Sequence, residues 1–234
     1  MNDLEERYDI RTAAAWLLGH GRRTGIPALP ESMRQKTADE CADDELTQIV
    51  TAGQEAGLKL YPFKTGTQIL PRTKRTLGFL RSVSFETMLD VGSGRGVFLI
   101  PFMKEFPWVQ VTSFDLLEKR VTFLNELADG GFCQLHAEQN DICHQPYPDG
   151  RFDVVTMLEV LEHIPDVERA VAAAVKMAKQ YVVVTVPSKP DNNPEHIHLL
   201  TKDKLSQMFS AAGCTRLHFD GVEGHLFMTA ALAQ

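Results

Sequence analysis

Hydrophobic and polar positions follow two different patterns along the chain, and the change falls near residue 85. Before it, apolar residues recur at helical spacing in residues 10–20, 45–56 and 73–82. No strand-like alternation occurs there, and the apolar content is too sparse for a large separate core. We therefore expect residues 1–72 to form a helical cap or lid rather than an independent domain.

From residue 85 onward, apolar runs alternate with amphipathic stretches. The apolar runs predict seven strands, at residues 87–91, 109–115, 132–136, 152–159, 181–187, 215–220 and 225–232. The amphipathic stretches predict helices at residues 97–106, 118–128, 166–179 and 202–212. This order predicts an α/β fold for residues 73–234, a doubly wound and mostly parallel seven-stranded sheet. A short glycine turn at 221–224 predicts a hairpin, and hence an antiparallel final strand.

A glycine-rich turn follows the first predicted strand. The segment reads Asp90-Val91-Gly92-Ser93-Gly94-Arg95-Gly96. Glycines at 92, 94 and 96 leave a surface without side chains, so a ligand can approach the backbone N–H groups closely. A purely structural turn needs fewer glycines. The turn therefore predicts a nucleotide-like cofactor.

Two acidic residues fall at later strand ends, where ligands of open α/β sheets bind. Asp115 lies about twenty residues past the glycine turn, which suits a carboxylate that accepts both hydroxyls of a ribose. The alternative is an Asp that caps the next helix. Asp141 suits an adenine amine, with Ile142 supplying its backbone N–H, or it caps a turn.

These residues resemble those of a known family. Asp90–Gly96 resembles motif I of the class I S-adenosylmethionine-dependent methyltransferases, and Asp115 and Asp141 resemble that family's ribose-side and adenine-side acids. The run Leu158–Asp166 is similar to the type 11/12-like branch. The spacing G-x-G-x-G, with Val97 next, disfavours a dinucleotide, which requires G-x-G-x-x-G.

The resemblance runs over residues 73–232 and implies a fold, a cofactor and cofactor-binding residues. The cofactor is S-adenosyl-L-methionine and its product is S-adenosyl-L-homocysteine. Asp90 and the glycine turn are expected to hold the amino-acid half of the cofactor, and Glu159 is placed among the cofactor-binding residues. The predicted activity is methyl transfer to oxygen or nitrogen of a small-molecule or sugar-like acceptor.

Methyl transfer is an in-line displacement that mainly needs alignment and partial desolvation. A hydroxyl or amine acceptor also needs a base. The candidates are His163, in the acidic segment after the fourth strand, and His196 and His198, which point the same way if their segment is extended. We expect His163 and one of the other two to form an acid/base pair; the alternative is that all three cap helices or bond to loops.

Three other functions remain open. Glu159, Glu162, His163 and His198 resemble the two-glutamate, two-histidine magnesium site of the small-RNA 3′-end 2′-O-methyltransferases. Such a set would also suit manganese or cobalt. The same pattern is common in the metal-free type 11 branch, so our prediction contains no metal. The second alternative is a non-catalytic cofactor-binding scaffold subunit, and the third is a nicotinamide-dependent oxidoreductase.

Charge and composition narrow the partners. The net charge of −7 repels nucleic acid. Four cysteines without a CxxC pair predict reduced thiols and a cytoplasmic location. No apolar run approaches the ~18 residues of a membrane helix, and the polar start at Met1–Arg7 argues against a secretory signal. The sequence leaves the acceptor and the oligomeric state open.

Overall fold

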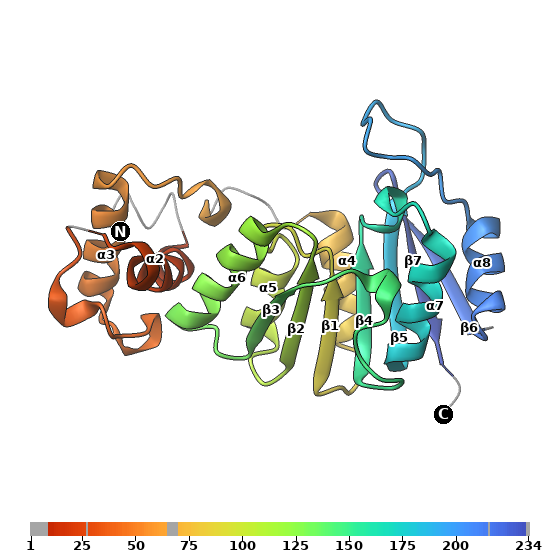
Figure 1. Cartoon of the computed structure of the whole chain (residues 1–234), viewed down its shortest axis with the longest axis horizontal. Helices are drawn as coiled ribbons and strands as arrows, with labels where there is room; N and C mark the ends of the chain where they lie inside the picture. Colours follow the sequence, from red (N-terminus) through yellow and green to blue (C-terminus); the bar gives the residue numbers. More distant parts are fainter. Residues whose placement is uncertain (1–8, 27, 65–69, 215, 233–234) are drawn as a thin grey trace. The chain divides into compact units, whose positions relative to one another are not determined.

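A computed structural model describes residues 9–26, 28–64, 70–214 and 216–232 (Figure 1). The predicted polar start at Met1–Arg7 and the predicted strand residue Thr215 lie outside the described residues. The chain divides into two compact units. We call them the helical unit (Met1–Gln68, Gly94–Pro107 and Leu117–Ala137) and the sheet unit (Ile69–Ser93, Trp108–Leu116 and Glu138–Gln234).

The seven strands form one sheet in the order β3-β2-β1-β4-β5-β7-β6. Their bounds are β1 Thr87–Val91, β2 Gln110–Asp115, β3 Leu135–Gln139, β4 Phe152–Leu158, β5 Ala178–Pro187, β6 Arg216–Val222 and β7 His225–Ala231. Strand β1 pairs in parallel with β2 and β4, and β4 pairs in parallel with β5. Strand β7 is antiparallel to both β5 and β6. The predicted fold class and antiparallel final strand are confirmed, although β7 lies inside the sheet and β6 at its edge.

The third strand begins three residues later than predicted. Residues 131–134 close helix α6 instead of extending: the N–H groups of Gly131 and Phe132 bond back to Ala128 and Leu127. Alternation begins only at Leu135, where buried and exposed side chains take turns along β3. Phe132, an apolar residue just after helix α6, was therefore wrongly assigned to the third strand.

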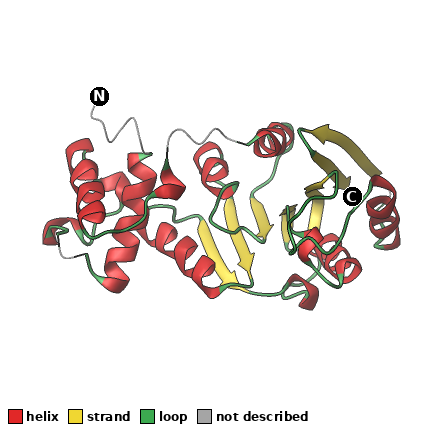
Figure 2. Cartoon of the chain, turned by 90° about the horizontal axis from the view of Figure 1, so that it is seen from above, coloured by secondary structure: helices red, strands yellow, loops and turns green. Residues whose placement is uncertain are grey.

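Successive side chains along β5 and along β7 point to opposite faces of the sheet, as the pleat of a strand requires. Val182, Val184 and Met228 belong to the main core, together with helices α7 (Val167–Met177) and α8 (Lys202–Ala211). The alternate residues Tyr181 and Phe227 meet Phe79 of helix α4 (Pro71–Leu80) edge to face. Helices therefore cover both faces of the sheet unit, and Figure 2 shows them on both sides of its strands.

The helical unit contains α2 (Ile10–Thr24), α3 (Asp43–Glu55), α5 (Leu99–Glu105) and α6 (Glu118–Gly130). Trp16 Nε1 donates to Glu126 Oε2 at 2.8 Å, and His20 Nδ1 lies 2.9 Å from Glu126 Oε1. A Cβ atom on Gly130 would collide with the carbonyl oxygen of Ala15, so α2 and α6 approach backbone to backbone. The N-terminal helices therefore share a core with α6, whereas their role as a cap or lid remains a prediction.

Short 3₁₀ turns complete the described elements. Three lie in the helical unit, η1 (Glu31–Met33), η2 (Ala38–Glu40) and η3 (Tyr61–Phe63), and two in the sheet unit, η4 (Ile142–His144) and η5 (Leu161–His163). Among the helices of the described ranges, none has the length and apolar character to cross a membrane.

The close α2–α6 packing predicts that Gly130→Ala destabilises the fold by ~1–3 kcal/mol or more, because the new methyl group has no space. The matched control is Gly78→Ala, on the exposed side of α4 with nothing near the added Cβ. It should stabilise the chain by ~0.5–1 kcal/mol through helix propensity. Urea unfolding followed by circular dichroism measures both. An unchanged midpoint for Gly130→Ala would contradict the close approach.

Candidate functional site

Three neighbouring parallel strands each carry a polar side chain at the same register position. The register aligns Asp90 in β1 with Ser113 in β2 and with Thr156 in β4, and all three are buried. Thr156 Oγ1 donates to Asp90 Oδ1 at 2.5 Å. Ser113 Oγ donates to Ser93 Oγ at 2.7 Å, and Ser93 Oγ donates to the carbonyl oxygen of Asp90 at 3.2 Å. The bond from Thr156 orients the Asp90 carboxyl, and the two serines hold the backbone where the glycine turn begins.

Burial raises the pKa of Asp90 to about 6, and the charge of Asp115 acts in the same direction. Hydrogen bonds from Ser93 and Thr156 oppose this shift without cancelling it. A buried carboxyl without a cationic partner costs stability. The position is therefore suited to a ligand that brings a positive charge.

The glycines after β1 are required by the backbone. Gly92, Gly94 and Gly96 have φ values of 69°, 59° and 73°, in the left-handed region that favours glycine. A Cβ atom on Gly92 would also lie 2.5 Å from Val160 Cγ2. Gly92 N donates to the carbonyl oxygen of Phe114 at 2.7 Å, which extends the β1–β2 ladder by one bond. The backbone of the turn therefore favours glycine at all three positions, and its contact with a ligand remains a prediction.

The two later acids have different surroundings. Asp115 ends β2 with 4% of its surface exposed. Asp141 is the N-cap of η4, where its Oδ1 accepts from Cys143 N at 2.9 Å. The side chain of Ile142 is buried in the core of the sheet unit. The capping alternative for Asp141 is thus present in the structure, and contact of these residues with a cofactor remains a prediction.

Glu159 directs its carboxyl toward β7. It follows β4 with φ 59°, a conformation uncommon outside glycine, and its N–H donates to the carbonyl oxygen of Thr185 at 2.9 Å. Glu159 Oε2 lies 2.8 Å from Nδ1 of His225. Among the described residues, its buried Oε1 has no hydrogen-bond partner. Strained backbone at an acidic strand end is typical of a functional position.

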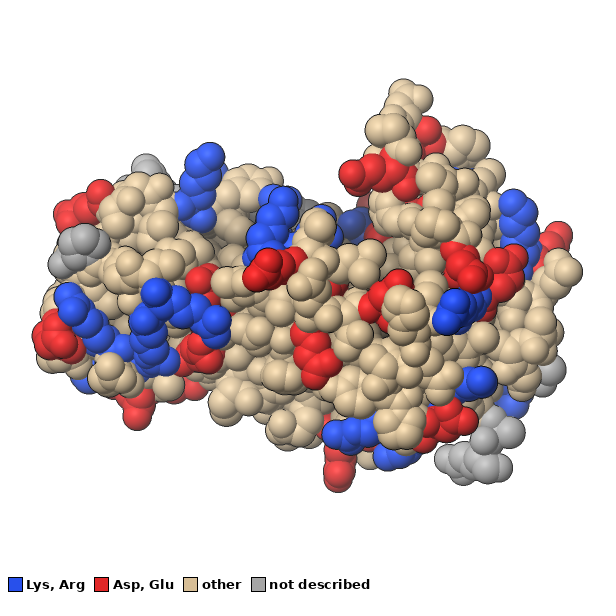
Figure 3. Space-filling view, viewed as in Figure 1, with Lys and Arg blue, Asp and Glu red and all other residues tan. Residues whose placement is uncertain are grey.

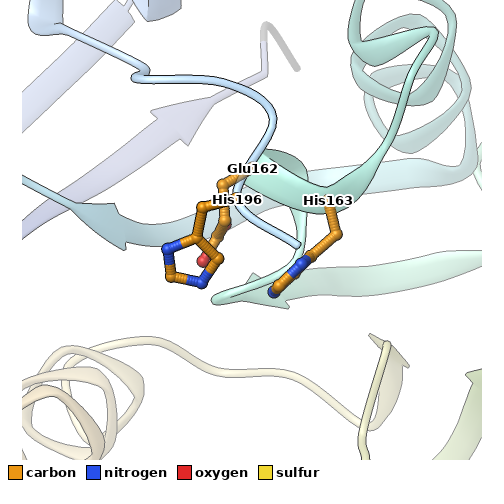
Figure 4. A group of neighbouring side chains, drawn as sticks. All are labelled: Glu162, His163 and His196. Carbon is orange, nitrogen blue, oxygen red and sulfur yellow. The ribbon is translucent and has the colours of Figure 1, made fainter. Parts of the chain in front are cut away.

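Glu162, His163 and His196 form a second group beyond β4, and Figure 4 shows their side chains close together. One ligand-type atom from each lies within 4.8 Å of the others. Burial raises the pKa of Glu162 to about 8, and the charge of Glu159 adds to this shift. His196 comes from the loop that stands above the ends of β4 and β5 in Figure 1.

The structure separates His196 from His198. His196 Nδ1 lies 2.8 Å from Asp191 Oδ2, whereas His198 Nε2 lies 3.0 Å from the carbonyl oxygen of Ile164. The segment is not an extended strand. The N–H groups of Ile197 and His198 both bond to the carbonyl oxygen of Glu162. The extended segment that would make the two histidines point the same way is therefore not present, and the group contains His196 but not His198.

Three polar residues of this edge were not predicted. Thr156 is the only hydroxyl residue in the run that forms β4, which was the available signal, and the structure aligns it with Asp90. His225 follows from the predicted hairpin: β7 is antiparallel, so its first residue pairs with Pro187 at the carboxyl edge of the parallel strands. Asp191 lies in a loop, and nothing in the sequence distinguished it.

The raised pKa of Asp90 predicts that the free energy of unfolding depends on pH. Its pKa is about 6 in the folded chain against 3.8 normally, so the folded state holds the proton more tightly than the unfolded state. Stability should fall as pH rises from 3.8 to 6, and the loss should stay constant above that, at about 3 kcal/mol. Asp90→Asn should therefore be more stable than the wild type at pH 7.5, with a difference that shrinks toward pH 4.

Asp220→Asn is the matched control. The hydrogen bond from Arg75 holds the pKa of Asp220 below its usual range, so this substitution should lower stability at pH 7.5. Thermal unfolding without ligands, across that pH range, measures both variants. Equal melting temperatures for Asp90→Asn and the wild type at pH 7.5 would contradict the buried charge.

Comparison with known proteins identifies the family. The family model described as a methyltransferase domain matches residues 64–218. The ubiquinone biosynthesis O-methyltransferase of Bordetella parapertussis is 35% identical over 100 residues, 42% of this chain and 40% of that relative. The chain spans less than half the length of the curated relatives it matches first.

Solved structures show the same fold. YcgJ from Bacillus subtilis superposes with a TM-score of 0.60 at 15% identity, over 69% of this chain and 99% of that one. Phosphoethanolamine N-methyltransferase 2 of Haemonchus contortus, in complex with S-adenosyl-L-methionine, gives 0.58 at 13% identity, over 69% and 53%. Since the family model covers well over half of the sequence, the chain belongs to the methyltransferase domain family, of the class I S-adenosylmethionine-dependent kind that the sequence resembles.

Proposed function

We propose that the chain is an S-adenosylmethionine-dependent methyltransferase that acts on oxygen or nitrogen of a small-molecule or sugar-like acceptor. The observation that carries this proposal is Asp90, a buried carboxyl two residues before the first of three glycines of positive φ. An amino-acid ammonium group would supply the positive charge that this carboxyl lacks, and the glycine backbone would receive the adjoining carboxylate.

Each remaining part of the cofactor has a candidate partner. Asp115 would accept the ribose hydroxyls, and Asp141 with the N–H of Ile142 would lie on the adenine side. Glu159, at the end of β4, would lie nearest the reacting end. When bound, the cofactor supplies an electrophilic methyl group on a sulfonium. The chain itself aligns the acceptor, excludes water and takes up a proton.

His163 and His196 could each offer an unprotonated ring nitrogen to remove a proton from the acceptor. His163 Nδ1 lies 2.9 Å from the carbonyl oxygen of Glu195, which fixes the proton on Nδ1 because a carbonyl can only accept. Nε2 of His163 is then left with a lone pair that could take up a proton. Asp191 does the same for His196. This arrangement supports the predicted role of His163 at the acceptor.

We also propose a cytoplasmic location and a small-molecule partner. Cys41, Cys133, Cys143 and Cys214 are free thiols, which suits a reducing compartment. The net charge of −7 disfavours nucleic acid. Basic side chains group over the N-terminal helices on the face in Figure 3. In the helical unit, Arg23 pairs with Asp129 and Arg34 with Glu31, so these cations have partners within the chain.

Cofactor binding is tested by calorimetry with S-adenosylhomocysteine. Asp115→Ala should raise the dissociation constant for S-adenosylhomocysteine at least ~10-fold, because hydrogen bonds to a buried carboxylate are lost. The control is Asp149→Ala: Asp149 precedes β4, so it lies at the opposite edge of the sheet. Failure of the wild type to bind, or binding of NAD instead, would refute the proposal.

Turnover is tested with metabolite pools, in search of a mass increase of one methyl group. With the acceptor found, His163→Ala should lower turnover strongly and leave the affinity for S-adenosylhomocysteine nearly intact. Unchanged turnover would remove His163 from the mechanism. Cofactor binding without any methylated product, across pools, would favour the scaffold alternative.

A further inference from the structure

A buried threonine hydroxyl without a partner lies in β5, the strand next to that of Thr156. Thr185 is 0% exposed, and its Oγ1 has no hydrogen-bond partner among the described residues. A buried hydroxyl that is left unbonded costs free energy, whereas Val would fill the same space without that cost. The position therefore carries a polar group that the packing of the sheet does not use.

Thr185 and His225 lie on the same face of the sheet. Val184 and Val186, on either side of Thr185, belong to the main core, so Thr185 points to the opposite face. It pairs with Phe227 of β7, which meets helix α4 on that face. His225 comes two residues before Phe227 and has the same orientation. It is therefore a diagonal neighbour of Thr185 at the carboxyl edge of the parallel strands.

Glu159 adds a carboxylate to this pair. Its N–H donates to the carbonyl oxygen of Thr185 at 2.9 Å, and its Oε2 lies 2.8 Å from Nδ1 of His225. That contact is close but is not a hydrogen bond: in the part of the chain that the structure describes, Nδ1 of His225 and Oε1 of Glu159 both lack a hydrogen-bond partner.

The backbone of Glu159 adds a second argument. Its φ of 59° is one that glycine adopts with less strain, so the carboxylate is present at a conformational cost. A carboxylate at such a position, next to an unbonded hydroxyl, is suited to a ligand that donates hydrogen bonds and brings a positive charge.

We propose that Glu159 and Thr185 bind an ammonium group of the methyl acceptor, and that the ring of His225 turns to admit it. A protonated amine has several N–H donors, which can reach Oε1 of Glu159 and Oγ1 of Thr185 together. A hydroxyl group has one donor and no charge to offer the carboxylate.

The entry to these atoms depends on two movable side chains. Those of Glu159 and His225 are 20% and 24% exposed, so rotation of either one opens the buried atoms to a ligand. The identification of this ligand as the methyl acceptor rests on the proposed function. Binding of an amine at this place does not.

The experiment compares amines with alcohols of the same carbon skeleton: benzylamine with benzyl alcohol, 2-phenylethylamine with 2-phenylethanol, and hexylamine with 1-hexanol. Binding to the full chain is measured by calorimetry at neutral pH, where these amines are protonated, with and without S-adenosylhomocysteine. We expect each amine to bind at least ~10-fold more tightly than its alcohol. Equal affinities within the pairs, or no binding of any amine at millimolar concentration, overturn the proposal.

Two variants assign the preference to these residues. Glu159→Gln should lower the affinity for the amines at least ~10-fold and leave that for the alcohols nearly unchanged, because only the amines need the charge. Thr185→Val should lower the affinity for the amines ~10-fold without lowering the urea midpoint, because its hydroxyl has no partner among the described residues. An unchanged preference for amines in both variants overturns the assignment.

Matched controls carry the same substitutions elsewhere. Glu86→Gln removes the same charge just before β1, at the opposite edge of the sheet. Thr229→Val changes the same face of β7, at a residue that pairs with Val183 and lies farther from the carboxyl edge. Both should keep the wild-type preference for amines, and circular dichroism establishes that each variant is folded.

The outcomes separate this proposal from the proposed function. Binding of S-adenosylhomocysteine without a preference for amines overturns the amine site alone. A preference for amines without binding of S-adenosylhomocysteine overturns the proposed function and leaves the amine site. Equal turnover of acceptors with and without an amine overturns the role of this site in binding the acceptor.

Discussion

The parallel pairing of β1 with β2 and β4 is the constraint on which the site depends. Parallel strands end at the same edge, so the register that matches Asp90 to Ser113 and Thr156 also brings the segments after all three strands together. The glycine turn, Asp115 and Glu159 are these segments. Strand β7 runs antiparallel to β5, so its first residue, His225, pairs with the last residue of β5. His225 therefore lies at the same edge as the ends of the parallel strands.

The sequence predicted the parts of this arrangement that depend on local pattern. Apolar runs, a glycine turn and an acid at each strand end have a period or a composition, and they gave the fold class and the position of Asp90. Contacts between residues that lie far apart in the chain have neither a period nor a characteristic composition. Glu159 meets His225, and His163 and His196 meet although they lie far apart in sequence. Only the hairpin offered a route to His225, since it fixed the direction of β7.

The loop after β5 shows why spacing alone was insufficient. Residues two apart point the same way only while the backbone is extended. Here two consecutive N–H groups turn toward one carbonyl oxygen, that of Glu162, and the side chains of His196 and His198 separate. The N-terminal helices show a related limit: pattern alone did not reveal that α6 supplies the surface opposite them, with Gly130 against the backbone of α2.

Acidic side chains concentrate at the carboxyl edge at a cost to stability. Burial raises the pKa of both Asp90 and Glu162, and neighbouring carboxylates raise them further. Apolar residues in their place would pack without this penalty, so the acids are best explained by what they bind. Under the proposed function, the ammonium group of the methyl donor would neutralise the charge of Asp90. Glu162 lies beyond β4, buried and close to the imidazoles of His163 and His196, so the cost of its charge falls in the same region of the sheet unit.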